Sequence, residues 1–315
     1  MVFSVILVFL LTITMVSPIV VAKSNDIVRE NYDVSVDDTV FVNLQRIYKE
    51  DVEMRGAVLM VHGGWHTKFF YHFEDDSKYS IQEYLANKKF DTYALDLRGS
   101  GDSYKSDYAW YSQISQDDYV EDIKAVVSDI QSKGYEKVHL IAHSLGGMVS
   151  CIYTAEYGSD TISSLILIGT PFSEFALDPE LLEQFRFAAE NYPVIPCDPE
   201  LIPMMFFAEG QVKDKVLERA TEIISQEVLG STIVLQSLDL IYADKVSEID
   251  EDIPVLVIQG GLDAIVTSQD AMNLFLELKG DNNDLRMYGE HGHNILLEKS
   301  AKKVYTDIYE FLKSN

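Results

Sequence analysis

Short runs of continuously apolar residues recur along the chain, and most of them end in a glycine or a reactive polar side chain. Such runs predict buried strands. The runs of this kind, some with the turn that follows, are 56–64, 90–103, 137–143, 163–169, 253–263 and 284–288. Residues 33–50 instead alternate apolar and polar positions, which predicts one or two further strands.

Amphipathic stretches separate these runs. In 116–133 the apolar side chains recur at the i, i+3, i+4, i+7 spacing of a helix, with acidic residues in the first turn and Gly134 at the end. The other expected helices are 77–89, with Ser77 or Ser80 as N-cap, 145–157, 267–279 and 298–312. Alternating strands and helices, with strands apolar throughout, predict an α/β fold with a mostly parallel sheet flanked by helices.

The alternation stops between residues 172 and 250, where the pattern is mainly helical and interrupted by prolines. We therefore expect an α/β core formed by 33–171 and 251–315, with 172–250 inserted between two late strands as a helical cap. Ligand sites of open parallel sheets form at the carboxyl ends of the strands, and the cap would lie above them.

Residues 1–22 carry no charged side chain and end in Val20-Val21-Ala22. Small residues at this point suit a cleavage site, so we expect a secretory signal peptide and a secreted or extracytoplasmic protein. The alternative is an uncleaved anchor, because an apolar stretch of this length can just span a bilayer and would attach the protein to a membrane. Without such an anchor we expect no stable membrane contact.

Charge narrows the partners further. The chain has 25 basic and 51 acidic residues, a net charge of −26. This argues against nucleic acid, whose phosphates require Lys and Arg, and against docking on anionic lipid. The two cysteines, Cys151 and Cys197, are not a disulfide framework. A single bridge stays open for an exported protein, although Cys151 falls in an expected buried helix.

Ser144 is the first candidate for chemistry. It lies in "LIAHSLGG", where a buried strand meets a helix through small residues. Such an elbow exposes a serine hydroxyl near a helix N-terminus, and the hydroxyl becomes a nucleophile when a base takes its proton. Ala142 stands where the G-x-S-x-G pattern has its first glycine.

Two later strand ends supply the partners of a serine nucleophile. Asp263 follows the strand in "VIQGGLD", and a carboxylate there can orient a histidine. His293 follows the last predicted strand, in "GEHGHNILLE". His291 competes for the role of base, but His293 directly precedes the apolar stretch that would dock it on the sheet. The order Ser, Asp, His is that of α/β-hydrolases.

An oxyanion requires two backbone N–H donors. Leu145, directly after the serine, is the candidate for one of them. The other should come from "HGGWHT" at 62–67, with Gly64 as the first candidate and Trp65 as the second. His62, His66 and His72 do not show a recognised zinc spacing, so we expect no metal and no cofactor.

The motifs "VLMVHGG", "LDLRGSGDS", "LIAHSLGG", "VIQGGLDAIV" and "GHNILLE" stand in the order and spacing of the α/β-hydrolase superfamily. The sequence resembles its monoacylglycerol lipase and lysophospholipase-like branch, related to serine aminopeptidases, over 35–313 apart from the cap. The resemblance implies that Gly64 and Leu145 form the oxyanion hole. It also implies that the turn from Asp96 to Ser103 shapes the site without reacting.

We therefore expect a serine hydrolase that cleaves carboxylic esters through Ser144, His293 and Asp263. Its substrate would be a small molecule: an acylglycerol, a lysophospholipid-like lipid or a small apolar ester. The alternatives are an aminopeptidase, with a cap carboxylate among Glu180, Glu183, Glu190 and Glu209 holding the substrate ammonium, or another amide, thioester or carbon–carbon hydrolase. The cap is rich in Phe and Met, which either pack its core or line an acyl pocket.

Overall fold

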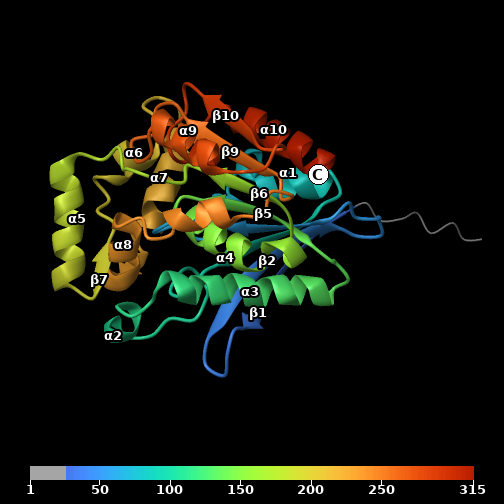
Figure 1. The fold of residues 1–315 in the computed structure, drawn as a ribbon, viewed down its shortest axis with the longest axis horizontal. Coiled ribbons are helices and arrows are strands. Elements are labelled where there is room, and N and C mark those ends of the chain that lie inside the picture. The colour runs from blue at the N-terminus through green and yellow to red at the C-terminus, as the bar shows by residue number, and fades with distance from the viewer. Residues whose placement is uncertain (1–25) are drawn as a thin grey trace, which may run out of the picture.

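An eight-stranded sheet runs through the centre of the computed structural model, which describes residues 26–315 (Figure 1). Its spatial order is β1-β2-β4-β3-β5-β6-β9-β10. The strands are β1 (Ile27–Ser35), β2 (Phe41–Lys49), β3 (Ala57–Val61), β4 (Asp91–Asp96), β5 (Val138–His143), β6 (Ile162–Ile168), β9 (Val255–Gly260) and β10 (Asp284–Tyr288). From β4 to β10 neighbouring strands are parallel, whereas β1 and β2 add an antiparallel edge. The predicted mostly parallel sheet is confirmed.

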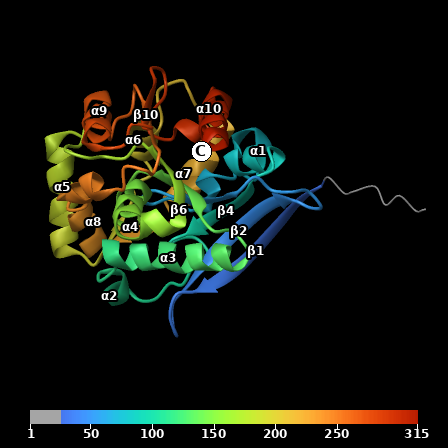
Figure 2. The ribbon, with the colours of Figure 1, turned by 45° about the vertical axis from the view of Figure 1, so that its right-hand side comes forward.

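Helices cover both faces of this sheet. Residues of α3 (Gln116–Ser132), α4 (Leu145–Thr161) and α9 (Ser268–Glu277) pack into one core cluster. Residues of α1 (Ile81–Asn87) and α10 (Ala301–Ser314) pack into the other. Figure 2 shows α3 and α1 on opposite sides of the sheet. Because both faces are covered, β3, β4, β5 and β9 are buried along their whole length, as their continuous apolar runs predict.

Local sequence signals set several helix ends. Ser80 is the N-cap of α1, after the short 3₁₀ turn Ser77–Tyr79, and its side chain accepts from the backbone of Glu83. Ser115 begins α3 with a reciprocal capping box to Asp118. Gly134 follows α3 with a φ of 102°, a conformation that glycine adopts without strain. The last helix begins at Ala301, later than the expected residue 298, because the short 3₁₀ turn Ile295–Leu297 precedes it.

The insertion between β6 and β9 forms the cap at one end of the sheet (Figure 1). Its elements are α5 (Pro179–Asn191), β7 (Val194–Pro196), α6 (Ile202–Phe206), α7 (Asp214–Ile224), β8 (Val228–Gly230), α8 (Ser231–Leu238) and the 3₁₀ turn Ala243–Glu248. The antiparallel ribbon of β7 and β8 is a feature that the helical pattern did not predict. Buried Asp270 of α9 fixes the start of the insertion by accepting from the backbone amides of Phe172, Ser173 and Glu174.

The predicted leader, residues 1–22, lies outside the described residues. Within 26–315 none of the helices is both long and apolar enough to cross a bilayer. Cys151 and Cys197 are both buried free thiols, so they do not form the bridge that the sequence left open.

Candidate active site

Ser144 occupies a sharp turn between β5 and α4. Its backbone has φ 52° and ψ −121°, a strained conformation for a residue with a side chain. The Ser144 amide donates to the carbonyl of Ile168 at the end of β6, at 2.9 Å. This strand–turn–helix geometry is the elbow that the sequence predicts, and it leaves Ser144 partly exposed between buried neighbours.

Close backbone contacts explain the small residues after the serine. A Cβ on Gly146 would lie 2.4 Å from the carbonyl oxygens of Val61 and His62, and one on Gly147 would lie 2.0 Å from Thr170 Oγ1. Ala142, in contrast, is fully buried in β5. The structure therefore accommodates the methyl group of Ala142, whereas Gly146 and Gly147 leave no room for a side chain.

His293 and Asp263 form a buried pair beside this turn. Nδ1 of His293 lies 2.8 Å from Oδ2 of Asp263. The other carboxylate oxygen of Asp263 accepts from the backbone amides of Ile265 (2.8 Å) and Val266 (3.0 Å), and Gln259 Nε2 donates to Oδ2 at 3.1 Å. Nε2 of His293 is buried and has no hydrogen-bond partner among the described residues. A neutral imidazole held in this way presents a free ring nitrogen that can accept a proton.

The structure brings His293, and not His291, to Asp263. His291 packs against Tyr288 with 5.7 Å between ring centroids, and neither of its ring nitrogens has a hydrogen-bond partner in the described part of the chain. Gly169, directly after β6, adjoins the pair: a Cβ there would lie 3.0 Å from His293 Nδ1 and 3.3 Å from Asp263 Oδ2. Ser144 is hydrogen-bonded to the residue before Gly169, so all three predicted residues lie around the end of β6.

The loop after β3 lies against the elbow. A Cβ on Gly63 would come within 2.9 Å of Ser144 Cβ and 2.8 Å of His143 Nδ1, so only glycine allows this approach. Gly64, Trp65 and Leu145, the predicted oxyanion donors, line the same cavity as Ser144. Trp65 has a φ of 55°, and its indole N–H donates to the carbonyl of Ile195 in β7 at 2.9 Å.

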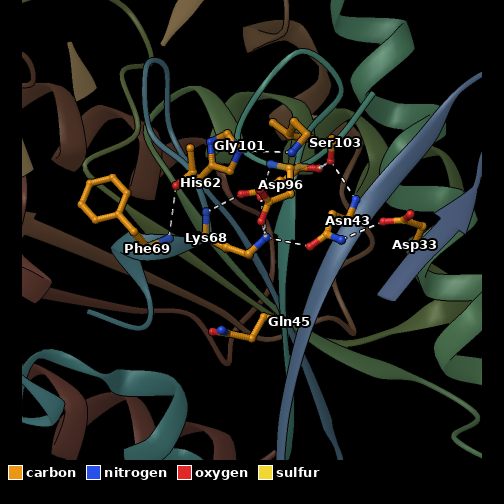
Figure 3. Close-up of polar contacts among 12 residues, drawn as sticks. Asp33, Asn43, Gln45, His62, Lys68, Phe69, Asp96, Gly101 and Ser103 are labelled. Atoms are coloured by element: carbon orange, nitrogen blue, oxygen red, sulfur yellow. Dashed lines mark hydrogen bonds and ion pairs between the residues drawn. The ribbon is translucent and has the colours of Figure 1, made fainter. Parts of the chain in front are cut away.

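A polar network around Lys68 and Asp96 adjoins this loop and supports it (Figure 3). The Lys68 ammonium donates to Asp96 (2.8 Å), Asp102 (2.7 Å) and Asn43 (2.6 Å), and the Lys68 backbone amide donates to Asp96 Oδ1 (2.6 Å). His62 Nε2 accepts from the Leu97 amide at 3.1 Å. The contacts of the turn after Asp96 agree with the non-reacting role that the resemblance implies for it, and His62 helps to shape the loop in the same way.

The cavity at Ser144 is apolar and small. Its volume is about 90 Å³, and Ser144 and Ser237 supply the hydroxyl groups among its lining side chains. Phe185, Met205 and Phe206 of the cap line it, whereas Phe187 and Met204 are exposed to solvent. The aromatic and Met residues of the cap therefore divide between the cavity wall, the surface and, for Phe207, the buried core. Among the described residues no carboxylate lines the cavity, and Glu180, Glu183, Glu190 and Glu209 are exposed.

Two residues near the pair were missed by the sequence analysis. Glu298 is fully buried and accepts from the backbone amides of Gly292 and of Ala208 in the cap. Burial raises its pKa to about 7. His66, considered above only as a metal ligand, packs behind the loop with its Nδ1 at 2.7 Å from the Gly64 carbonyl. Within 26–315 no group of three or more His, Cys, Asp or Glu side chains has the arrangement of a metal site.

This arrangement of fold and site is that of a hydrolase with a serine elbow. The family model of the α/β hydrolase fold matches residues 56–300, and the chain belongs to this family. The assignment agrees with the resemblance found in the sequence.

Individual relatives are more distant. The chain is 28% identical over 228 residues to the dihydrolipoyllysine-residue acetyltransferase component of the acetoin cleaving system of Pseudomonas putida, covering 70% of this chain and 56% of the relative. It is 24% identical over 188 residues to human monoacylglycerol lipase ABHD6, covering 56% of this chain and 55% of the relative. The chain thus spans about half the length of these two curated relatives. An esterase from Exiguobacterium antarcticum shares the fold, with a TM-score of 0.69, 17% identity and coverage of 89% of this chain and 98% of that one.

Proposed function

We propose that the protein is a serine hydrolase that cleaves carboxylic esters with small apolar acyl groups. The observation that carries the proposal is the buried Asp263–His293 hydrogen bond with a free His293 Nε2, next to a strained Ser144 that lines an apolar cavity. The relatives named as an esterase and a monoacylglycerol lipase support the same chemistry.

In the proposed reaction, Ser144 Oγ forms a bond to the ester carbonyl carbon while its proton passes to His293 Nε2. The π electron pair of the carbonyl moves onto its oxygen, which becomes an oxyanion. This oxyanion accepts hydrogen bonds from the backbone amides of Leu145 and of Gly64 or Trp65. Collapse of this intermediate breaks the bond to the alcohol, which leaves with the proton from His293. Water then attacks the acyl-enzyme by the same route, giving the carboxylic acid and free Ser144.

Asp263 holds His293 in the tautomer that protonates Nδ1, and it stabilises the imidazolium that forms during the reaction. Two backbone amides and Gln259 donate to the carboxylate and hold it in place. These contacts are of the kind that an orienting carboxylate requires.

The size and polarity of the cavity support the substrate class. Its volume of about 90 Å³ is below the roughly 150 Å³ of an apolar cavity that binds benzene, so it fits a short acyl group. An aminopeptidase would require a carboxylate for the substrate ammonium, and none lines the cavity. A long-chain acylglycerol would require the cap to move.

Labelling with a fluorophosphonate probe tests the reaction class, because the probe reacts with an activated serine. We expect labelling of the wild type and none of Ser144→Ala. Hydrolysis of p-nitrophenyl acetate, butyrate, octanoate and palmitate, beside an aminoacyl anilide, then tests the substrate. We expect the highest kcat/KM among the shortest esters. Faster cleavage of the anilide would overturn the assignment to esters.

A further inference from the structure

His66 lies directly behind the loop that carries the candidate oxyanion donors. Its side chain is fully buried and does not line the cavity at Ser144. The imidazole is stacked on Phe69 and meets Phe206 and His143 edge-on, with ring centroids 5.0 Å and 5.4 Å away respectively. A ring enclosed in this way cannot touch a substrate, so any effect it has on the reaction must pass through its neighbours.

Both ring nitrogens of His66 face oxygen atoms. Nδ1 lies 2.7 Å from the carbonyl oxygen of Gly64, and Nε2 lies 3.1 Å from Oδ1 of Asn294. A neutral imidazole has one N–H, so it cannot donate to both. The amide nitrogen of Asn294, meanwhile, is buried and has no partner among the described residues. The close contact of His66 Nε2 with Asn294 Oδ1 and the unpaired Asn294 Nδ2 are connected, because both atoms belong to the same side-chain amide.

An imidazolium would donate to both oxygens, but burial opposes it. Burial is the main cause that lowers the pKa of His66 to about 3; the hydrogen bonds to Gly64 and Asn294 act in the opposite direction, and the neighbouring His293 and His62 add to the lowering. Reversing the Asn294 amide gives every nitrogen a partner: Asn294 Nδ2–H donates to His66 Nε2, and His66 Nδ1–H donates to the Gly64 carbonyl. After this reversal the Asn294 side-chain oxygen has fewer hydrogen bonds. A buried carbonyl oxygen that lacks a hydrogen bond is less rare in proteins than a buried N–H without a partner.

The hydrogen bond to Gly64 fixes a peptide plane. Because the peptide bond is planar and trans, holding the Gly64 carbonyl toward His66 directs the Trp65 N–H the opposite way. The His66 backbone amide donates to the Gly63 carbonyl at 3.2 Å and closes the same turn. On the other side of His66, Asn294 directly follows His293 in the chain. The backbone amide of Asn294 donates to the carbonyl oxygen of Phe206 at 2.7 Å. His66 thus joins the candidate oxyanion loop to the segment of the candidate base.

We propose that neutral His66, protonated on Nδ1 and linked to Asn294, is a positioning residue that sets the orientation of the Trp65 N–H, one of the two candidates for the second oxyanion donor. The inference rests on the proposed ester hydrolysis. It makes His66 important for the oxyanion intermediate and unimportant for binding the ground-state ester.

Two isosteric variants separate the two ring nitrogens. In His66→Asn the side-chain NH₂ takes the place of Nδ1 and keeps the donor to Gly64. In His66→Gln the NH₂ takes the place of Nε2, and that donor is lost. Since losing one oxyanion donor costs about 10²–10³ in kcat, we expect His66→Gln to lower kcat roughly 10- to 100-fold at nearly unchanged KM. His66→Asn should recover most of this loss.

A trifluoromethyl ketone supplies a readout that a merely structural role would not change. Ser144 Oγ adds to its carbonyl carbon, the serine proton passes to His293, and the carbonyl oxygen becomes a stable oxyanion. Its Ki should rise for His66→Gln by the same factor as kcat/KM falls, while His66→Asn stays near the wild type. Nitrogen-15 spectra of the labelled imidazoles should show His66 neutral and protonated on Nδ1 at pH 7.

The outcomes distinguish this inference from the proposed function. A wild type that the fluorophosphonate probe does not label overturns both. A labelled wild type in which His66→Gln and His66→Asn have equal kcat and Ki, or a His66 that is cationic at pH 7, overturns the inference alone. If His66→Gln does not fold by circular dichroism, Asn294→Ala decides. It removes the partner of Nε2 without changing the ring, and an unaltered kcat would contradict the link.

Discussion

Two cavities flank the loop between β3 and α1, and they differ in whether the polar groups around them have hydrogen-bond partners. The first is apolar and contains Ser144; beside the Ser144 turn, His293 Nε2 is buried without a hydrogen-bond partner among the described residues. The second, of about 380 Å³, is lined by charged side chains around Lys68 and Asp96. There the three N–H groups of the Lys68 ammonium face three oxygen atoms at 2.6 to 2.8 Å.

The comparison distinguishes a reactive site from a structural one. Leaving a buried polar group without a partner costs free energy, so the unpaired ring nitrogen of His293 next to the strained turn of Ser144 points to function. A fully paired cluster points to a structural role, even though it contains more charge. Three variants, two of them with a matched control, test this division, and Glu298→Gln tests a buried group outside both cavities; the largest expected effect comes first.

Ser144→Ala removes the proposed nucleophile from the apolar cavity. We expect kcat to fall by about 10⁴-fold or more, as for triad knockouts in other serine hydrolases, because the oxyanion donors alone remain. The melting temperature should stay close to that of the wild type. Ester turnover by the purified variant measures the effect, and a rate near the wild type would place the chemistry elsewhere.

Lys68→Met breaks the fully paired cluster instead. Asp96 is 1% exposed, and the variant would leave its buried side chain without the ammonium. Removing one partner of a buried ion pair costs about 3–5 kcal/mol, which urea unfolding measures. Among folded molecules kcat should fall far less than in Ser144→Ala, because the network shapes the loop without touching the reacting atoms.

Lys105→Met is the matched control. Lys105 is 3.6 Å from Glu227 and 41% exposed, so its loss should cost about 1 kcal/mol or less. A loss of kcat in Lys68→Met as large as in Ser144→Ala would erase the contrast between the two cavities.

Glu298 should make stability depend on pH in the direction opposite to an ordinary carboxylate. Burial raises its folded pKa from 4.5 to about 7. The folded state therefore holds the proton more tightly, and its stabilising contribution is complete below about pH 4.5 and lost as the pH rises through about 7. The contribution is at most about 3 kcal/mol.

Glu298→Gln removes this titration. Urea unfolding of both proteins between about pH 5 and 8 isolates the group, because the buried histidines titrate in both proteins and cancel in the difference. We expect the wild type to lose stability relative to Glu298→Gln as the pH rises. A difference that does not vary with pH would contradict the raised pKa.

Phe185→Ala should enlarge the apolar cavity, since Phe185 lines it and packs against Trp65 with 5.7 Å between ring centroids. The ratio of kcat/KM for the octanoate over the acetate ester should rise about tenfold, the scale of one or two methylene contacts. Phe187→Ala, on the same helix but 61% exposed, should leave the ratio unchanged. Equal effects of both variants would mean that Phe185 is not part of the acyl site.

The sequence predicted the core and the three strand-end residues because their signals are local. Continuous apolar runs place β3, β5, β6 and β9 in a covered parallel sheet, and chain order assigns Ser144, Asp263 and His293 to its carboxyl edge. The ribbon of β7 and β8 was not predictable in this way. Its strands have three residues each, too few for a periodicity, and β7 ends on Pro196.

Contacts between distant segments were also beyond the sequence. His66 and Asn294 are 228 positions apart, and nothing in either neighbourhood encodes the other. The choice of His293 over His291 rested on the apolar stretch that follows it, and the structure places that histidine on Asp263. The sequence predicted Glu298 only as the first residue of a helix. In the structure its carboxylate accepts from the backbone amide of Gly292, before His293, and from that of Ala208 in the cap.

The hydrogen bond from the Trp65 indole to the Ile195 carbonyl should make the fluorescence of Trp65 report movement of the cap. The chain has two tryptophans, so Trp110→Phe leaves one fluorophore, and that fluorophore joins the cap ribbon to the loop beside Ser144. Withdrawal of the ribbon would expose the indole to water and shift its emission to longer wavelength. Stopped-flow fluorescence with a slowly hydrolysed ester would then time the entry of each acyl chain without any attached label.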